Sequence, residues 1–495
     1  MNSSTSNIWQ ATRVRRRHNE RDVKMIRLII EKEIRELIGS TKFAITFGAT
    51  ALLILLAFYS GARNYQVSVA QYEAAKREDI RQLEGVTDWS NVRQRRVMLP
   101  PQPLAALVTG VANDIGRTVE VQGRGELTPE DSRYGDEPVF AVFRFLDFDF
   151  VVQVVLSLFA ILLAYDSVSG EKERGTLKLS FANAIPRARY LFGKIAGSLI
   201  GLLAPLLVAI LLGCLVIPVL GVHLVADEWV RLALIVLAGL LYASAFCTLS
   251  VMISSFTQKS ATSFLVLLVV WISCVLIVPR TSVLLAGKAV DVPSAEYLAA
   301  QKSRFSRQTW SEDRQKMSNF KPSPEAKGEE MFKEFNKFMS KLGEERDLKM
   351  KDFASRLNEA RQNRMDAQLR LSLGIARVSP AATFSLAAMG LAGTSIELKQ
   401  HYRKEAEGYQ AAFAGFIREK TGMNPSGGMI MMRIETDRDE KPKPVNPAEL
   451  PEFRYSPMSL AMVGGSVVFD FGLLAFFNLL FFGGAFAAFL RYDVR

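Results

Sequence analysis

Six long apolar runs, none with a charged residue deep inside it, constrain this 495-residue chain more than any other feature. Each run has, or nearly has, the ~20 residues that a helix needs to cross a hydrocarbon core of about 30 Å. Each must be helical there, because lipid offers no partner to backbone N–H and C=O groups. The sequence therefore predicts an α-helical polytopic membrane protein with six transmembrane helices. The predicted spans are 43–60, 148–165, 195–220, 231–253, 262–279 and 463–490.

The distribution of Lys and Arg predicts the orientation, because cytoplasmic segments near the spans carry an excess of these residues. Residues 13–42 hold ten basic residues, whereas the short loop 221–230 has two acidic residues and neither Lys nor Arg. We therefore expect the first of these segments in the cytoplasm and the second outside. The cytoplasmic segments are then 1–42, the loop 166–194 and the tail 491–495, and the two extracytoplasmic domains are 61–147 and 280–457.

The two outer segments differ in pattern. The first has a Pro-rich stretch and a Val-Glu-Val strand candidate at 119–121, so we expect a small mixed domain. The second has apolar residues at helical spacing over 325–342 and 343–373, which predicts a packed helical hairpin. A third helix is expected over about 395–420. The second domain is therefore predicted to be mainly helical.

The composition argues against several function classes. The net charge of +11 comes largely from basic residues at the predicted cytoplasmic ends of spans, so no nucleic-acid partner is expected. All three cysteines lie in apolar runs and the three histidines lie on separate segments, which leaves no disulfide, zinc or catalytic constellation. The cluster Met423–Met432 has thioethers that suit copper(I), but Met is also a pliable packing residue, so we expect no metal there.

Acidic residues are nearly absent from the predicted spans. Only Asp149 and Asp470 occur in the runs, each near the start of its run and flanked by Phe. We interpret both as markers of the outer interface, with a proton or ion site as the alternative. The lack of charge at mid-membrane depth argues against a proton-driven transporter.

The loop 166–194 has the pattern of a short helix, a break and a return to the membrane. Acidic residues at 171 and 173 suit the positive end of a helix dipole, and Pro186 ends the run. Candidate helix caps precede them at Asp166, Ser167 and Ser169. Three basic residues are expected to anchor the next span at the lipid headgroups, namely Arg187, Arg189 and Lys194.

This loop resembles the one between the second and third spans of ABC-2-type transporter permeases. The residues that carry the resemblance are Gly170-Glu-Lys-Glu-Arg-Gly-Thr-Leu177, Ile185-Pro-Arg187 and Gly193-Lys194. In that family the loop forms a coupling helix that docks into a separate nucleotide-binding subunit. The resemblance implies that the residues facing the ATPase are Glu171, Lys172, Glu173, Arg174, Gly175 and Thr176.

Two further segments extend the resemblance. The amphipathic stretch 23–38 is similar to the connecting helix of the family, although its pattern alone equally fits a membrane-surface helix without a partner. The insert 280–457 resembles a subgroup with an enlarged extracytoplasmic domain between the last two spans. The chain shows no ATPase of its own, because Gly170–Gly175 is followed by Thr-Leu where a phosphate loop requires Lys-Ser or Lys-Thr.

The resemblance therefore implies a permease without a cofactor of its own. ATP and Mg would be bound by an ABC ATPase subunit in two copies, beside a second permease, identical or a sister chain, and membrane lipid. We expect export of a lipid-like or other substrate across a bacterial inner membrane. The alternative is a non-transporting membrane protein that transmits force from the ATPase to a periplasmic partner.

Overall fold

The computed structural model describes residues 24–92, 94–112, 116–122, 127–129, 147–182, 185–321, 328–421 and 444–491. The Met423–Met432 cluster lies outside them. A helix over 24–38 comes first, and the apolar half then contains α2 (Thr41–Arg81), α4 (Phe148–Phe150), the π-helical turn η3 (Val151–Leu156), α5 (Ser157–Ala164), α6 (Ser169–Glu173), α7 (Thr176–Ala182), α8 (Arg187–Val219), α9 (Ala226–Phe256), α10 (Ser260–Trp271), the π-helical turn η4 (Ile272–Ile277), α11 (Val278–Ala289), α14 (Pro380–Ala392) and α16 (Leu460–Leu490). The remaining elements are η1 (Trp89–Asn91), β1 (Gln94–Met98), η2 (Pro103–Ala106), β2 (Thr118–Gln122), β3 (Thr128–Pro129), α12 (Ala295–Ser318), α13 (Glu329–Ala376), α15 (Glu397–Thr421) and η5 (Pro447–Glu449).

Among the described residues, seven helical stretches are long and apolar enough to cross a membrane. Six of them contain the six predicted runs. The seventh, Pro380–Thr421, was not predicted as a span and joins α14 to the more polar α15. Gly393 separates the two helices with a left-handed φ of +69°. The chain is thus a mainly helical, multi-pass membrane protein with one more candidate span than the sequence predicts.

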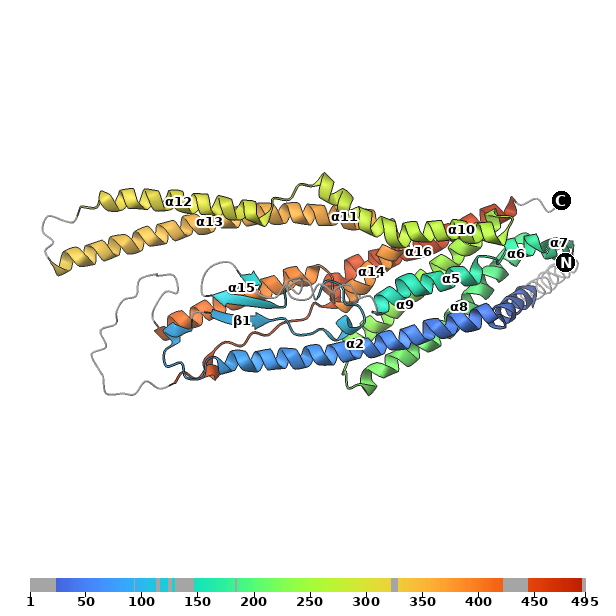
Figure 1. Ribbon diagram of the computed structural model, residues 1–495, viewed down its shortest axis with the longest axis horizontal. Coiled ribbons are helices and arrows are strands. Elements are labelled where there is room, and N and C mark those ends of the chain that lie inside the picture. Colours follow the sequence, from blue (N-terminus) through green and yellow to red (C-terminus); the bar gives the residue numbers. More distant parts are fainter. Residues whose placement is uncertain are drawn as a thin grey trace, which may run out of the picture.

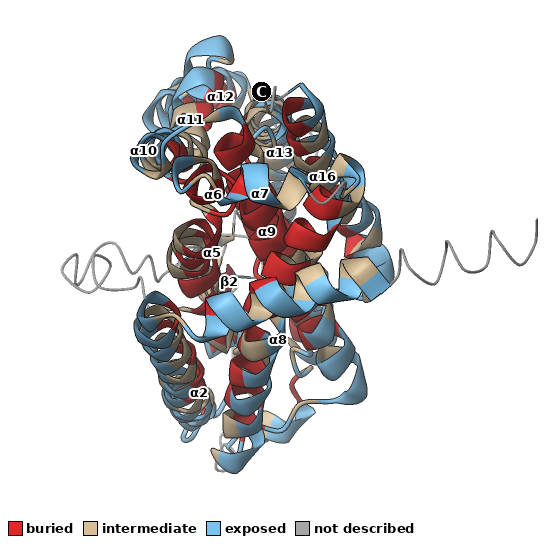
Figure 2. Ribbon diagram, turned by 90° about the vertical axis from the view of Figure 1, so that its right-hand side faces the viewer, coloured by how far each residue is buried: buried red, intermediate tan, exposed pale blue. Residues whose placement is uncertain are grey.

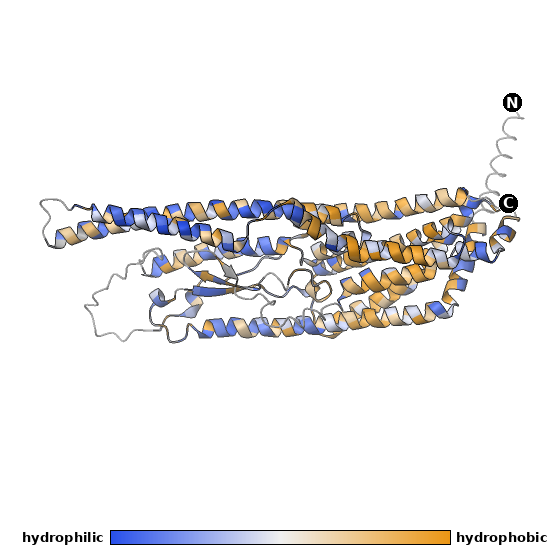
Figure 3. Cartoon of the chain, turned by 45° about the horizontal axis from the view of Figure 1, so that its top comes forward, coloured by the Kyte–Doolittle hydropathy of each residue, from blue (hydrophilic) through white to orange (hydrophobic). Residues whose placement is uncertain are grey.

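The apolar half is organised around α9. This helix packs against α16, α14, α5 and α8, and Figure 2 shows it as a buried helix surrounded by the others. Its Tyr242 stacks on Phe384 of α14 with 5.2 Å between the ring centroids. Large apolar side chains remain exposed on the outer surfaces of α2, α8, α10 and α16. Figure 3 shows that hydrophobic residues are concentrated in the half of the molecule that holds the bundle, as expected of a membrane-embedded bundle.

The other half contains a small α/β unit. Its antiparallel sheet has the order β1-β2-β3, with Val97 opposite Val119. Helix α15 covers the sheet and shares one hydrophobic core with it, including Val121, Tyr402 and Phe413 (Figure 1). The Tyr402 hydroxyl donates hydrogen bonds to the Val97 and Arg117 carbonyls at 2.8 and 3.0 Å. The two outer segments, expected as separate domains, therefore contribute to one core.

A long helical hairpin extends beside this unit (Figure 1). Its two helices are α12 and α13, and they are joined by the stacked rings of Phe305 and Phe353 at 4.1 Å. The predicted hairpin was wrong in detail, because residues 329–342 of its first stretch and the whole of 343–373 belong to the single 48-residue helix α13. Gly343 did not break it, since one glycine costs a helix only about 1 kcal/mol relative to alanine. The third predicted helix, about 395–420, is confirmed as α15.

Candidate functional site

The helix 24–38 lies against the first turns of α8 through three glycines. A Cβ added at Gly193 would lie 2.9 Å from Ile29 Cγ2, and one at Gly197 would lie 2.7 Å from Glu33 Cβ. At Gly201 the nearest atom would be Leu37 Cδ1 at 3.2 Å. The four-residue spacing places the three glycines on one face of α8, where the backbones approach closely. The amphipathic helix is therefore packed within the chain along this face.

A cluster of charged groups lies at this contact, and we call Lys32, Glu33, Glu171, Tyr190 and Lys194 the charged junction. The Lys194 ammonium donates to Glu33 Oε2 and to Glu171 Oε1, both at 3.0 Å. Lys194 is 3% exposed, Glu171 4% and Glu33 7%. An ammonium buried so fully needs paired carboxylates, because desolvation of a lone charge is costly. Burial raises the pKa of Glu33, and Lys194 opposes that rise.

Glu171 has the most complete set of partners in the junction. Its Oε1 also accepts from Lys32 Nζ at 3.3 Å, and its Oε2 accepts from the Tyr190 hydroxyl. Lys32 comes from the helix 24–38 and Tyr190 from the first turn of α8. One carboxylate on α6 therefore connects three elements that are distant in the sequence.

Two of the predicted site residues lie inside the chain. Lys194 was expected to anchor α8 at the headgroups, but the helix 24–38 covers it and its charge is neutralised inside the chain. Glu171 was expected to face the ATPase, but its carboxylate points into the junction and is almost inaccessible. Arg187 donates to the Leu490 carbonyl of α16 at 3.1 Å, which holds the two helix ends together. Arg189 is half-buried nearby.

The residues after Glu171 form the turn between α6 and α7, and we call Glu173–Thr176 the docking turn. Glu173 and Arg174 are exposed, and Gly175 has a φ of +74°, which suits the reversal of the chain between the two helices. The Thr176 hydroxyl donates to the Glu171 carbonyl at 3.4 Å. The turn thus presents its charged side chains to the outside.

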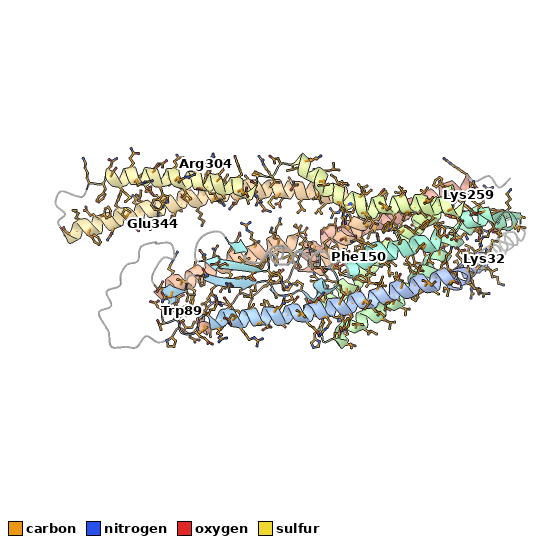
Figure 4. All side chains as sticks on the ribbon, viewed as in Figure 1. Lys32, Trp89, Phe150, Lys259, Arg304 and Glu344 are labelled. Carbon is orange, nitrogen blue, oxygen red and sulfur yellow. The ribbon has the colours of Figure 1, made fainter. Side chains whose placement is uncertain are left out.

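Hydrogen bonds join α6 and its flanking residues to the end of α9 and to the start of α10. The Ser254 hydroxyl accepts from the Val168 and Ser169 amides at 3.0 and 2.9 Å. Lys172 donates to the Ser255 and Thr257 carbonyls at 2.5 and 3.1 Å, so it also lies against the chain. Glu173 accepts from the Ser260 amide and hydroxyl at the start of α10. Figure 4 shows Lys32 and Lys259 at this same end of the molecule, far from Arg304 and Glu344 on the hairpin.

Several of these residues were not predicted from the sequence. Tyr190 and Ser198 have no local pattern that marks them, because their roles require separate segments to fold together. Glu33 does have one, since it interrupts the apolar face of 23–38 between Ile29 and Leu37. The three glycines also have one, since their four-residue spacing is typical of close helix packing.

The two acidic residues of the apolar runs lie away from the junction. Asp470 is 1% exposed and accepts from Arg377 at 2.6 and 3.2 Å, so its charge is paired. Asp149 accepts from Gln153 and Ser385 at 2.7 and 3.0 Å. Within the described residues, no group of three or more His, Cys, Asp or Glu side chains has a metal-binding arrangement.

Comparison with known families agrees with the resemblance of the loop. A family model described as ABC-2 family transporter protein matches residues 27–323, which include the charged junction and the docking turn. A second model, described as a domain of unknown function (DUF3526), matches residues 296–455, which include the hairpin and α15. No curated protein matches the chain. Because the first match covers more than half of its length, the chain belongs to the ABC-2 family of transporter proteins, as a membrane component of an ABC transporter.

Proposed function

We propose that this chain is the permease subunit of an ATP-driven exporter and that the energy enters through the docking turn. The observation that carries the proposal is the two-sided construction of α6. Its exposed end presents Arg174 and Glu173, although Glu173 also accepts from Ser260 of α10. Its buried side is bonded to α9 and to the charged junction. A partner that pushes on the turn therefore moves several helices at once.

The partner is an ABC ATPase that binds ATP and Mg, in two copies beside two permeases. The family match supports such an association. Two short charged turns, one from each permease, would then meet two ATPase subunits. Glu173 and Arg174 provide the direct contact, while Gly175 and Thr176 shape the turn. Glu171 and Lys172 act from inside, because both are bonded within the chain.

We propose six spans, with both ends of the chain in the cytoplasm of a bacterial cell and the hairpin and the α/β unit outside its inner membrane. The length of α14 argues against the seventh candidate. Helix α14 has 13 residues, about 20 Å at 1.5 Å per residue, which is shorter than the hydrocarbon core. Helix α15 belongs to the outer core with the sheet. The match of residues 296–455 to a model of its own supports a subgroup with an enlarged outer domain.

A lipid-like substrate fits the spans best. The buried Asp470 of α16 is paired with Arg377, which follows the bundle-side end of α13, so its charge is compensated within the chain. The apolar surfaces of the spans suit an apolar molecule that moves along the bundle more than a hydrated ion.

One observation favours the second candidate, force transmission without transport. Helix α13 runs without a break for 48 residues, about 70 Å, from its contact with α11 to the far end of the hairpin. A helix of this kind can carry a movement of the bundle to a periplasmic partner.

Affinity purification of the full chain in mild detergent tests the proposed association. We expect an ABC ATPase to co-purify in equal amount and to hydrolyse ATP faster with the permease than alone. Purification of the chain without any ATPase, from cells that make the full complement of subunits, would contradict it. Substrate movement in sealed vesicles distinguishes export from force transmission.

A further inference from the structure

We infer that Lys194 is the positioning residue that makes the helix 24–38 follow the movement of α6. This inference rests on the proposed function. It adds the set of contacts through which a movement of the docking turn reaches the other helices. Lys194 is buried on α8 between carboxylates of both elements, Glu33 and Glu171, and donates to each at 3.0 Å. Removal of Lys194 would leave these two carboxylates facing each other.

The charge arrangement explains why a lysine is required. Glu171 retains Lys32 and Tyr190 as other donors. Among the residues that the structure describes, the Glu33 carboxylate has only the Ser198 hydroxyl besides Lys194, at 3.5 Å. The ion pairs that connect α6 to the helix 24–38 are therefore made by the half-exposed Lys32 and by the buried Lys194. A buried ion pair is strong and directional, whereas an exposed one is weak.

The glycine face of α8, formed by Gly193, Gly197 and Gly201, determines which helices move together. Gly193, Gly197 and Gly201 place α8 and the helix 24–38 within van der Waals contact, with little space for relative motion at that face. Lys194 follows Gly193 directly, so it links this packed pair to α6. Movement of α6 is then delivered to α8 and, through the helix 24–38, to α2, which begins three residues later.

The first test replaces the three charges by neutral groups of similar size, as Glu33→Gln, Glu171→Gln and Lys194→Met in one chain. Neutral replacement of a whole buried ion set commonly preserves folding. We expect normal membrane insertion and normal retention of the ATPase, because the docking turn is unchanged. The stimulation of ATP hydrolysis by the permease should fall at least tenfold. Stimulation equal to wild type would overturn the inference, and so would loss of the ATPase.

The second test locks the packed pair, α8 and the helix 24–38, covalently. A Cβ at Gly193 would lie 3.0 Å from Ile29 Cβ, close to the roughly 3.5–4.5 Å of a disulfide, so the pair Ile29→Cys and Gly193→Cys can be oxidised after a small shift. This disulfide should leave the otherwise wild-type chain active, because the two helices move together. The same chain under reducing conditions is its control. Loss of stimulation on oxidation would show that the helices must separate, which contradicts the inference.

If the triple variant fails to insert, Glu33→Gln provides the test, because it leaves the Lys194–Glu171 pair in place. It should lower stimulation several-fold with the ATPase retained, and unchanged stimulation would overturn the inference. Failure of the proposed function would be visible separately, as a wild-type chain that retains no ATPase.

Discussion

At the residue scale, the glycine face and the charged junction depend on each other. The close approach at Gly193 and Gly197 brings Glu33 within reach of Lys194, and the ion pair offsets the burial of both charges. The three glycines have a four-residue spacing, and Glu33, four positions from both Ile29 and Leu37, interrupts the apolar face of 23–38. The partner of such a charge cannot be read from one segment, which is why the pairing of Lys194 with Glu33 and Glu171 was not predicted.

A single methyl group tests this contact. Gly197→Ala would place a Cβ 2.7 Å from Glu33 Cβ, so we expect a loss of about 1–3 kcal/mol and a lower Tm of the purified protein. Gly48→Ala is the matched control, because Gly48 is also helical and a Cβ there meets nothing within 4 Å. Equal Tm values for the two variants in thermal unfolding would contradict the packing described.

At the element scale, the apolar runs predicted the helices of the bundle well, because lipid permits little else. The outer elements were predicted less well. Helix α12 was not predicted, and the packing of the sheet on α15 joins residues 305 positions apart, such as Val97 and Tyr402. Neither local propensity nor periodicity contains that information.

Removal of one ring tests whether the two outer segments form one unit. Phe413 is 1% exposed in the shared core, so Phe413→Ala should cost about 3–5 kcal/mol. In limited proteolysis, cleavage should then increase together in 94–122 and in α15. Phe332→Ala is the control, since Phe332 is 65% exposed on α13. Increased cleavage in α15 alone, with 94–122 still protected, would show two independent domains.

At the scale of the whole molecule, the charged junction and the hairpin lie at opposite ends, with the apolar bundle between them (Figure 4). The proposed topology follows from this arrangement. Impermeant maleimide should label Ser311→Cys on α12 in intact spheroplasts, whereas Lys178→Cys on α7 should react only after the membrane is broken. Both positions lie on exposed parts of their helices. The reverse pattern would invert the chain in the membrane and place the docking turn out of reach of ATP.

The most direct test of the account reverses the two exposed charges of the docking turn, as Glu173→Lys with Arg174→Glu. Like charges would then face a complementary partner surface, at a cost of several kcal/mol. We predict a normally inserted permease that no longer retains the ATPase or stimulates ATP hydrolysis. Glu344→Lys with Lys349→Glu on the exposed hairpin is the control and should behave as wild type. If the docking-turn variant binds and stimulates the ATPase like wild type, the turn is a solvated loop and the central claim is contradicted.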